Sequence, residues 1–235
     1  MIDFHTHVLP FVDDGSKSVE ESIALLLMLK EQGVDTVVAS PHFRPEKESV
    51  DSFIKRRDEA YSRLKAELSP GLPSVLLGAE VSYYEGISHL EGIERLTLNQ
   101  SNLLLLEMPM RRWSEFMVRE VVELITVNGF DVVLAHAERY ERFATKDDLT
   151  YLLEQGAFIQ VNASFFTVRF MRNKALKWLK KSMFHCIGTD CHNLQSRPPR
   201  MREALDIIKK KSGNNFNTNQ KILSILERKK QNENI

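Results

Sequence analysis

The sequence contains little cysteine, with only Cys186 and Cys191 among 235 residues. Two thiols cannot build a disulfide framework, and such low usage is typical of a reducing compartment. The chain also lacks a run of about 20 apolar residues, the length that a membrane-spanning helix needs. No positively charged segment followed by an apolar segment stands at its start. We therefore expect a cytoplasmic protein without stable membrane insertion.

The chain has no excess of charge of either sign. Lys+Arg and Asp+Glu number 32 each, so the formal net charge is zero at pH 7. No global field therefore attracts nucleic acid or a membrane surface. A basic stripe with interleaved aromatic residues is not visible either, which argues against nucleic-acid binding. Overall neutrality does not exclude a local basic patch, and the oligomeric state stays open.

Internal repeats and low-complexity linkers are also absent, so we expect a single domain over residues 1–235, with a frayed polar tail from about residue 229. Seven apolar blocks rich in Val, Ile and Leu alternate with helical patterns. The blocks do not alternate with polar residues, which is typical of parallel strands covered on both faces. The alternation predicts βα units with right-handed crossovers. Strands are expected near residues 1–5, 35–40, 74–79, 103–107, 131–136, 157–162 and 184–189.

The first helix has the clearest boundary signals. Ser18 and Glu21 form a capping-box pattern, in which each side chain satisfies a backbone donor of the other residue. Gly33 supplies the stop. Residues 209–219 are expected to form a polar loop before a last helix. Further helices are expected near residues 50–68, 114–128, 146–155, 172–182, 199–211 and 218–230.

Six of the seven blocks end on side chains that bind metal ions. His5 and His7 follow the first block with a spacing that puts both on one face of a strand, and Asp190 and His192 repeat this spacing after the last block. Barrel-type α/β proteins place their chemistry at the C-terminal ends of their strands. We therefore predict one polar pit that holds several ions. The remaining strand ends contribute His42, Glu80, Glu107 and His136.

A carboxylate just after the first block is a further candidate ligand. Asp13 and Asp14 compete for this role, and Asp14-Gly15 is also an ordinary turn sequence. With Asp14, the set has nine members, too many for one ion, so two or three ions are expected. Imidazoles mixed with carboxylates suit Mn, Fe or Zn, and the lack of a cysteine cluster argues against a structural zinc. Such clusters activate bound water and clamp the oxygens of a transferring phosphoryl group.

Two other patterns have competing explanations. His89 and His185 lie away from the strand ends, and we interpret them as surface or helix-end histidines. Cys191 and Arg197 have the Cys-x5-Arg spacing of phosphatases that use a thiolate nucleophile. That loop surrounds the phosphate with backbone N–H groups and usually contains glycine, but residues 192–196 contain none. A metal-based mechanism is therefore favoured over a cysteine nucleophile.

These residues resemble the polymerase-and-histidinol-phosphatase (PHP) superfamily. Within it, the chain is similar to the bacterial manganese-dependent tyrosine phosphatases of capsule and exopolysaccharide clusters. The matching segments occur in the expected order from residue 2 to about residue 205. They are Ile2-Asp3-Phe4-His5-Thr6-His7, Val12-Asp13-Asp14-Gly15, Pro41-His42, Gly78-Ala79-Glu80, Ala135-His136-Ala137-Glu138-Arg139-Tyr140, Gln160-Val161-Asn162-Ala163-Ser164 and Asp190-Cys191-His192-Asn193-Leu194-Gln195-Ser196-Arg197-Pro198-Pro199.

The resemblance implies a distorted seven-stranded (β/α)7 barrel of the PHP type with a trinuclear site, and Mn²⁺ as its cofactor. It implies hydrolysis of phosphotyrosine, typically on the tail of the tyrosine kinase that controls polysaccharide export. Arg139 and Arg197 match the family's substrate-phosphate arginines, and a planar guanidinium suits phosphate bidentately. Asn162 and Ser164 are candidates for phosphate or supporting contacts. The implied ligands are His5, His7, Asp14, His42, Glu80, Glu107, His136, Asp190 and His192.

Two alternative functions remain open at this point. A histidinol-phosphate phosphatase or another small-molecule phosphoesterase would use the same pit with a different mouth. A non-catalytic metal-binding module would hold metal but cleave no phosphoester. The stretches 43–50 and 108–114 are expected to shape the mouth because of their positions after strand-like blocks.

Overall fold

The computed structural model describes residues 1–213 and 216–228, so the tail expected from about residue 229 lies outside the described residues. All seven expected strands are present, with ends displaced by two residues or fewer. They are β1 (Ile2–Thr6), β2 (Thr36–Ala39), β4 (Ser74–Leu77), β6 (Leu103–Glu107), β7 (Asp131–Leu134), β8 (Phe158–Asn162) and β9 (Cys186–Gly188).

Two short strands were not expected from the sequence, β3 (His42–Phe43) and β5 (Glu80–Ser82). Each continues an expected strand after a break. Pro41 separates β2 from β3, and proline cannot donate to a strand ladder. Gly78 separates β4 from β5, where a Cβ atom would lie 2.5 Å from Leu98 Cδ2. The breaks therefore reflect a missing donor at one position and close packing at the other.

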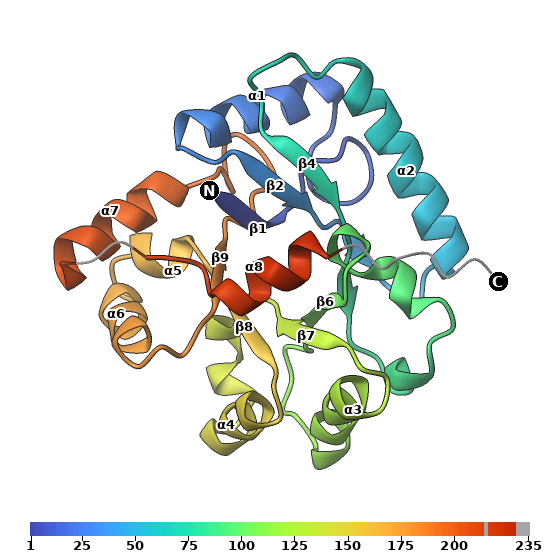
Figure 1. Ribbon diagram of the computed structural model, residues 1–235, viewed down its shortest axis with the longest axis vertical. Helices are drawn as coiled ribbons and strands as arrows, with labels where there is room; N and C mark the ends of the chain where they lie inside the picture. The colour runs from blue at the N-terminus through green and yellow to red at the C-terminus, as the bar shows by residue number, and fades with distance from the viewer. Residues whose placement is uncertain (214–215, 229–235) are drawn as a thin grey trace.

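All strand pairs are parallel. One sheet has the order β1-β2-β4 and the other β3-β5-β6-β7-β8-β9. Figure 1 shows the strands as a curled layer in the middle of the molecule, with helices around its outside. Strands covered in this way have apolar side chains on both faces, which explains their continuous apolar sequences. The chain thus has a mixed α/β fold with a curled parallel sheet.

The expected long helices are also present. They are α1 (Val19–Glu31), α2 (Val50–Ala66), α3 (Glu115–Thr126), α4 (Lys146–Glu154), α6 (Arg172–Lys180), α7 (Met201–Ser212) and α8 (Gln220–Glu227). The polar loop expected over residues 209–219 begins later than predicted, because α7 continues to Ser212 before Gly213 adopts a left-handed conformation at φ +76°. Residues 216–219 belong to no helix or strand, as expected. Short helices without enough residues for a periodic pattern were missed: η1 (Ile87–His89), η2 (Ile93–Leu96), η3 (Leu98–Gln100), η4 (Ala137–Arg142) and α5 (Ser164–Thr167).

The capping box predicted at α1 is only half formed. Ser18 Oγ accepts a hydrogen bond from Glu21 N at 3.1 Å, as predicted. The Glu21 carboxylate accepts from Lys17 N at 2.8 Å, one residue before the cap, so the reciprocal contact was wrong. A complete capping box occurs instead between Thr145 and Asp148 at the start of α4.

Buried apolar side chains form two clusters on opposite sides of the curled sheet. The larger one lies between the strands and the outer helices. The smaller one joins Phe4, Val38 and Leu105 to Ile222 and Leu226 of α8. Figure 1 shows α8 lying across the strands. This helix covers the end at which the strands begin and leaves their C-terminal ends to the polar residues.

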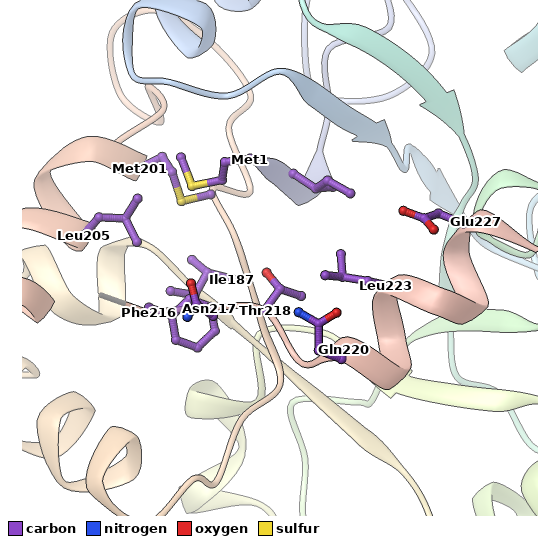
Figure 2. Close-up of a pocket in the computed structure, with 11 residues that line it drawn as sticks. Met1, Ile187, Met201, Leu205, Phe216, Asn217, Thr218, Gln220, Leu223 and Glu227 are labelled. Carbon is purple, nitrogen blue, oxygen red and sulfur yellow. The ribbon is translucent and has the colours of Figure 1, made fainter. Parts of the chain in front are cut away.

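A cavity of about 390 Å³ lies beside α8 at this covered end. Figure 2 shows Met1, Ile187 and Leu223 among the side chains around it. Its lining is mostly apolar, and it lies away from the ligand-bearing strand ends. Among the residues that the structure describes, no helix is both long enough and apolar enough to span a bilayer.

The first and last strands approach each other closely. Asp190 N donates to His5 O at 2.8 Å, and Thr6 forms a parallel bridge with Cys191. The buried Asp3 carboxylate, whose pKa burial raises to about 6, accepts from Thr189 N at 2.9 Å and from Thr189 Oγ1 at 2.7 Å. This contact brings ligands from the two ends of the chain to the same place.

We expect Gly188→Ala to separate these two strands. The added Cβ would lie 2.5 Å from His5 Cβ and 3.0 Å from His5 N, and overpacking of this kind costs about 1–3 kcal/mol. The midpoint temperature of thermal unfolding and the metal content should both decrease. Gly71→Ala is the control: its φ of +99° makes it costly too, but nothing lies within 4 Å, so metal content should stay normal. Full metal binding by Gly188→Ala would contradict the prediction.

Candidate metal centre

The residues predicted as ligands lie together at the C-terminal ends of the strands. Glu80 is at the middle of the group and is completely buried. Its Oε2 lies 2.8 Å from His42 Nδ1, 3.3 Å from His5 Nε2 and 3.5 Å from His7 Nε2. Its Oε1 lies 2.8 Å from His136 Nε2. One carboxylate from β5 thus contacts four imidazoles from three segments of the chain, which follow or lie in β1, β3 and β7.

The other predicted carboxylates surround this centre. Asp190 Oδ1 lies 3.4 Å from His7 Nε2, and Glu107 Oε1 lies 3.4 Å from His136 Nε2. Asp14 Oδ1 lies 3.3 Å from His42 Nε2 and 3.5 Å from His192 Nε2. All nine residues therefore belong to one network. By contrast, the side chain of His89 is 78% exposed, and His185 Nδ1 accepts from Ile159 N at 3.0 Å, so neither takes part.

Hydrogen bonds on the outer ring nitrogens determine which nitrogens face the centre. His7 Nδ1 lies 2.6 Å from Asp13 Oδ2, and His5 Nδ1 lies 3.2 Å from Gln160 Oε1. His192 Nδ1 lies 3.0 Å from Asp190 O. Each partner is an acceptor, so the proton belongs on Nδ1 and Nε2 presents a lone pair. This is the arrangement that metal-binding imidazoles adopt.

These ring nitrogens converge on one another and on the Glu80 carboxylate. His5 Nε2 and His7 Nε2 are only 3.0 Å apart, and Glu80 Oε2 faces both. Within residues 1–213 and 216–228, the buried atoms Glu80 Oε2 and His192 Nε2 have no hydrogen-bond partner. Buried polar atoms without a partner are costly. A cation between them would remove that cost, so the donor set fits metal ions.

The ligand atoms form overlapping groups rather than one. Four groups among the described residues, each with its ligand atoms within 4.8 Å of one another, share His7 and His42 between them. Sharing of this kind suits neighbouring ions joined by common ligands. The groups are His5 with His7 and Asp190, His7 with His42 and His192, His42 with Glu80 and Glu107, and Asp13 with Asp14 and His42.

The charges of the neighbours suit a cation as well. Burial alone would raise the pKa of Glu80, but the charge of His5, the hydrogen bond with His136 and the adjacent His42 ring hold that pKa well below its usual range. Burial, His7 and Arg197 lower the pKa of His192 to about 4, so its ring is neutral at pH 7. Burial opposes protonation of His136, yet Glu107 and Glu80 raise its pKa to about 9. A cation that binds His136 must therefore displace a proton.

Two of the predicted ligands have backbone conformations that residues other than glycine rarely adopt. His136 has φ +32° and Asp190 has φ +54°. Residues in the left-handed region cost of order 1–3 kcal/mol and persist where the surroundings enforce them. Here His136 N donates to Gln160 Oε1 at 2.7 Å, which directs the chain after β7 into the pit.

The two aspartates that compete for one ligand position have different surroundings. Asp14 is 62% exposed and faces His42 and His192. Asp13 is nearly buried and accepts from His7 Nδ1, from His42 N at 2.9 Å and from Gly15 N at 2.8 Å. A side chain at Gly15 would lie 2.3 Å from His7 O, so glycine is needed for this turn. Asp13 therefore orients a ligand, a role that the sequence analysis did not assign.

We expect Asp13→Asn to weaken metal binding while leaving the fold intact. Both carboxylate oxygens accept from N–H groups, so the amide would turn an NH₂ toward a donor. Losing a partner that orients a ligand lowers metal affinity by about 10–100-fold, which competition titration can measure. Asp147→Asn, in the exposed first turn of α4, should bind metal normally. Unchanged affinity in Asp13→Asn would contradict the assignment.

The two predicted arginines both contact Asp190. Arg139 Nη2 donates to Asp190 Oδ2 at 2.6 Å, and Arg197 Nη2 donates to Asp190 Oδ1 at 2.8 Å. Asn162 Nδ2 donates to Asp190 Oδ2 at 2.8 Å. A cavity of about 280 Å³ lies over both guanidinium groups, with Ser164 also in its lining. The arginines thus lie between the ligand cluster and an open space.

Cys191 does not have the surroundings of a nucleophile. Its side chain is completely buried among apolar residues. Burial raises the pKa of its thiol well above the usual value, whereas reactive cysteines have a lowered pKa and partial exposure. The Cys-x5-Arg spacing between Cys191 and Arg197 therefore does not indicate a thiolate mechanism.

Comparison with known proteins gives consistent matches over the whole described fold. The family model described as capsular polysaccharide synthesis, CpsB/CapC, matches residues 1–225. A tyrosine-protein phosphatase CpsB of Streptococcus pneumoniae is 35% identical over 229 residues, which is 91% of each chain. A tyrosine-protein phosphatase YwqE of Bacillus subtilis is 28% identical over 220 residues, covering 91% of this chain and 85% of the relative.

A solved structure has the same fold. It comes from work on YwqE of Bacillus subtilis and CpsB of Streptococcus pneumoniae, described as unique metal-dependent tyrosine phosphatases. The match has a TM-score of 0.78 at 25% identity, and covers 91% of this chain and 88% of that one.

Proposed function

This chain belongs to the CpsB/CapC family of capsular polysaccharide synthesis, and on that basis we propose that it is a metal-dependent protein-tyrosine phosphatase. The observation that carries the proposal is that predicted metal-binding histidines and predicted phosphate-binding arginines both contact Asp190. Asp190 Oδ1 faces His5 and His7 and accepts from Arg197, and Asp190 Oδ2 accepts from Arg139. Metal ligands and phosphate-binding cations thus adjoin at one carboxylate.

The residues divide into roles that suit a phosphomonoester. His5, His7, Asp14, His42, Glu80, Glu107, His136, Asp190 and His192 would hold the ions, with Mn²⁺ as the first candidate and Fe or Zn as others. Bound ions of this class activate water and neutralise charge on phosphoryl oxygens. Arg139 and Arg197 offer guanidinium N–H groups to the non-bridging oxygens, and this binding orients phosphorus toward the ligand cluster. Asn162 holds Asp190 in place for both groups.

We further propose that the strands form a distorted (β/α)7 barrel of the PHP type within a single domain over residues 1–235. Counting β2 with β3 and β4 with β5, because each pair is one chain path, gives seven positions. The Thr6–Cys191 bridge next to β9 supports closure. In such a barrel one end carries the chemistry and the other stability, which agrees with the polar and apolar ends described above.

The proposed substrate is a phosphotyrosine-bearing protein, namely a bacterial tyrosine kinase of capsule or exopolysaccharide synthesis, in the cytoplasm. Phosphotyrosine carries its phosphate on a longer side chain than phosphoserine does, so a site whose ligands are buried selects phosphotyrosine by reach. A small-molecule phosphoesterase that acts on histidinol phosphate is the alternative. The same ligands and arginines would serve both, and only the mouth would differ.

Turnover by purified, Mn²⁺-loaded protein tests the proposal. We expect hydrolysis of a phosphotyrosine peptide with kcat/KM at least about 100-fold above that of a matched phosphoserine peptide or histidinol phosphate, a difference of about 2.7 kcal/mol. Metal analysis of the same sample should give two or three ions per chain. A preference for histidinol phosphate would support the alternative, and bound metal without turnover of any phosphoester would indicate a non-catalytic module.

A further inference from the structure

The chain is neutral overall, yet one helix has only cationic charges. Residues 172–181, which cover α6 and its C-terminal cap, contain two types of base and no acid: Arg172, Lys174, Lys177, Lys180 and Lys181. Lys174, Lys177 and Lys181 have the spacing i, i+3, i+7, which places them on one face of the helix. Lys180 lies off this face.

This face lines a cavity rather than open solvent. The cavity has a volume of about 380 Å³, and Lys146 of α4 completes its basic rim over Trp178 and Leu149. Glu141 is the one acidic residue in its described lining, and it already forms an ion pair with Lys174. Among residues 1–213 and 216–228, Lys146, Lys177 and Lys181 have no acidic partner within ion-pair distance. The cavity in Figure 2 differs, since its lining contains no Lys or Arg.

The cavity continues toward the metal centre. A neighbouring cavity of about 600 Å³ is lined by Arg139 at one side and by Glu141 and Lys174 at the other. Arg139 also lines the cavity over Asp190, and Glu141 and Lys174 also line the lysine-rich one. The three cavities therefore adjoin one another, in a row that begins at the predicted phosphate-binding arginines and ends at the lysines of α6. We call this row the lysine groove.

The middle of this groove exposes apolar side chains. Phe170 is 86% exposed and Met110 is 42% exposed, and both line the middle cavity. An apolar patch with a polar rim is the kind of surface that marks a ligand-binding groove. Such residues suit the backbone and apolar side chains of a peptide between two charged anchors.

We propose that this lysine groove, from Arg139 past Phe170 to Lys177 and Lys181, binds acidic side chains of the substrate peptide that flank its phosphotyrosine. The inference rests on the proposed phosphatase function and adds a preference for acidic sequence. From Lys174 to Lys181 the helix rises about 10 Å, the length of about three extended residues. The groove therefore accommodates a short run of acidic residues beyond an apolar one.

Charge-reversed variants and three substrates test this proposal. The substrates are para-nitrophenyl phosphate and two phosphotyrosine peptides, identical except that one has glutamates and the other serines at the flanking positions. For the native protein we expect the acidic peptide to have a KM about 10-fold lower, and the difference to diminish at high salt. Lys177→Glu/Lys181→Glu should abolish this preference through KM while leaving kcat/KM for para-nitrophenyl phosphate unchanged.

Lys180→Glu/Lys210→Glu is the matched control. It makes the same change in net charge, places one glutamate near the end of α6, and changes no residue that lines the groove. It should keep the native preference. Equal KM values for both peptides with the native protein, or equal effects of the two double variants, would overturn the inference. Failure to hydrolyse para-nitrophenyl phosphate and both peptides would instead count against the phosphatase function itself.

Discussion

Chelation of the bound metal should abolish hydrolysis of phosphotyrosine by this protein, whereas Cys191→Ser should retain most of it. The metal ions supply several kcal/mol of transition-state stabilisation, so their removal should lower kcat/KM by at least about a thousandfold. Added Mn²⁺ should restore activity. Cys191 is buried and its thiol is held protonated, so an isosteric hydroxyl should have little effect. Steady-state kinetics on a phosphotyrosine peptide measures both effects.

The reverse pattern would reject a metal-based mechanism. Activity that survives complete metal removal, shown by elemental analysis, but disappears in Cys191→Ser would indicate a thiolate nucleophile. Cys191 is in contact with β1 through the Thr6 bridge. The midpoint of thermal unfolding of Cys191→Ser should therefore be compared with that of the native protein. The other thiol, Cys186, is also completely buried and lies outside the Cys-x5-Arg spacing, so Cys186→Ser is the matched control.

Glu80→Gln should cause the largest loss of any single conservative substitution. Its carboxylate contacts His5, His7, His42 and His136 at 2.8–3.5 Å. Glutamine keeps the shape but removes the charge that compensates bound cations. We expect the metal content to decrease by at least one ion per chain, and kcat/KM to decrease by about 100- to 1,000-fold, or about 2.7–4 kcal/mol. Elemental analysis and kinetics should be measured on the same samples.

Glu120→Gln serves as the control for the loss of a buried glutamate. Glu120 is 4% exposed and accepts from the Tyr83 hydroxyl and from Gly86 N at 2.7 Å. Its substitution should lower thermal stability, because one of these donors loses its acceptor, without lowering the metal content. If Glu80→Gln kept its full metal content, the proposed ligand set would have to be revised.

Sequence patterns predicted the strands and long helices well because burial on both faces leaves a simple signature. The apolar blocks of β6 and β8 agree with the structure to within one residue. Interruptions were harder to predict. Gly78 breaks a strand because Leu98, a residue from a short helix 20 positions away, packs against it, and no local pattern indicates such a contact.

The sequence predicted which polar residues lie together at the strand ends but not the contacts that support them. Ligands at strand ends follow from spacing and residue type, since parallel strands share one C-terminal edge. Asp13 and Gln160 orient predicted ligands through hydrogen bonds to His7 and His5. Their residue types alone do not indicate this supporting role. A carboxylate next to His-x-His is the signal that could have found Asp13, because metal-binding imidazoles are commonly held by a carboxylate.

The order of residues along this chain was sufficient to establish the alternating βα plan, the chemical types of the ligands and the family resemblance, because each depends on local periodicity or on short motifs. Three-dimensional packing was needed to distinguish Asp14 at the mouth from Asp13 behind His7. It was also needed to join Arg139, Phe170 and the lysines of α6 into one groove. Both depend on distances between segments far apart in the chain, and those distances arise only when the strands curl and the helices pack around them.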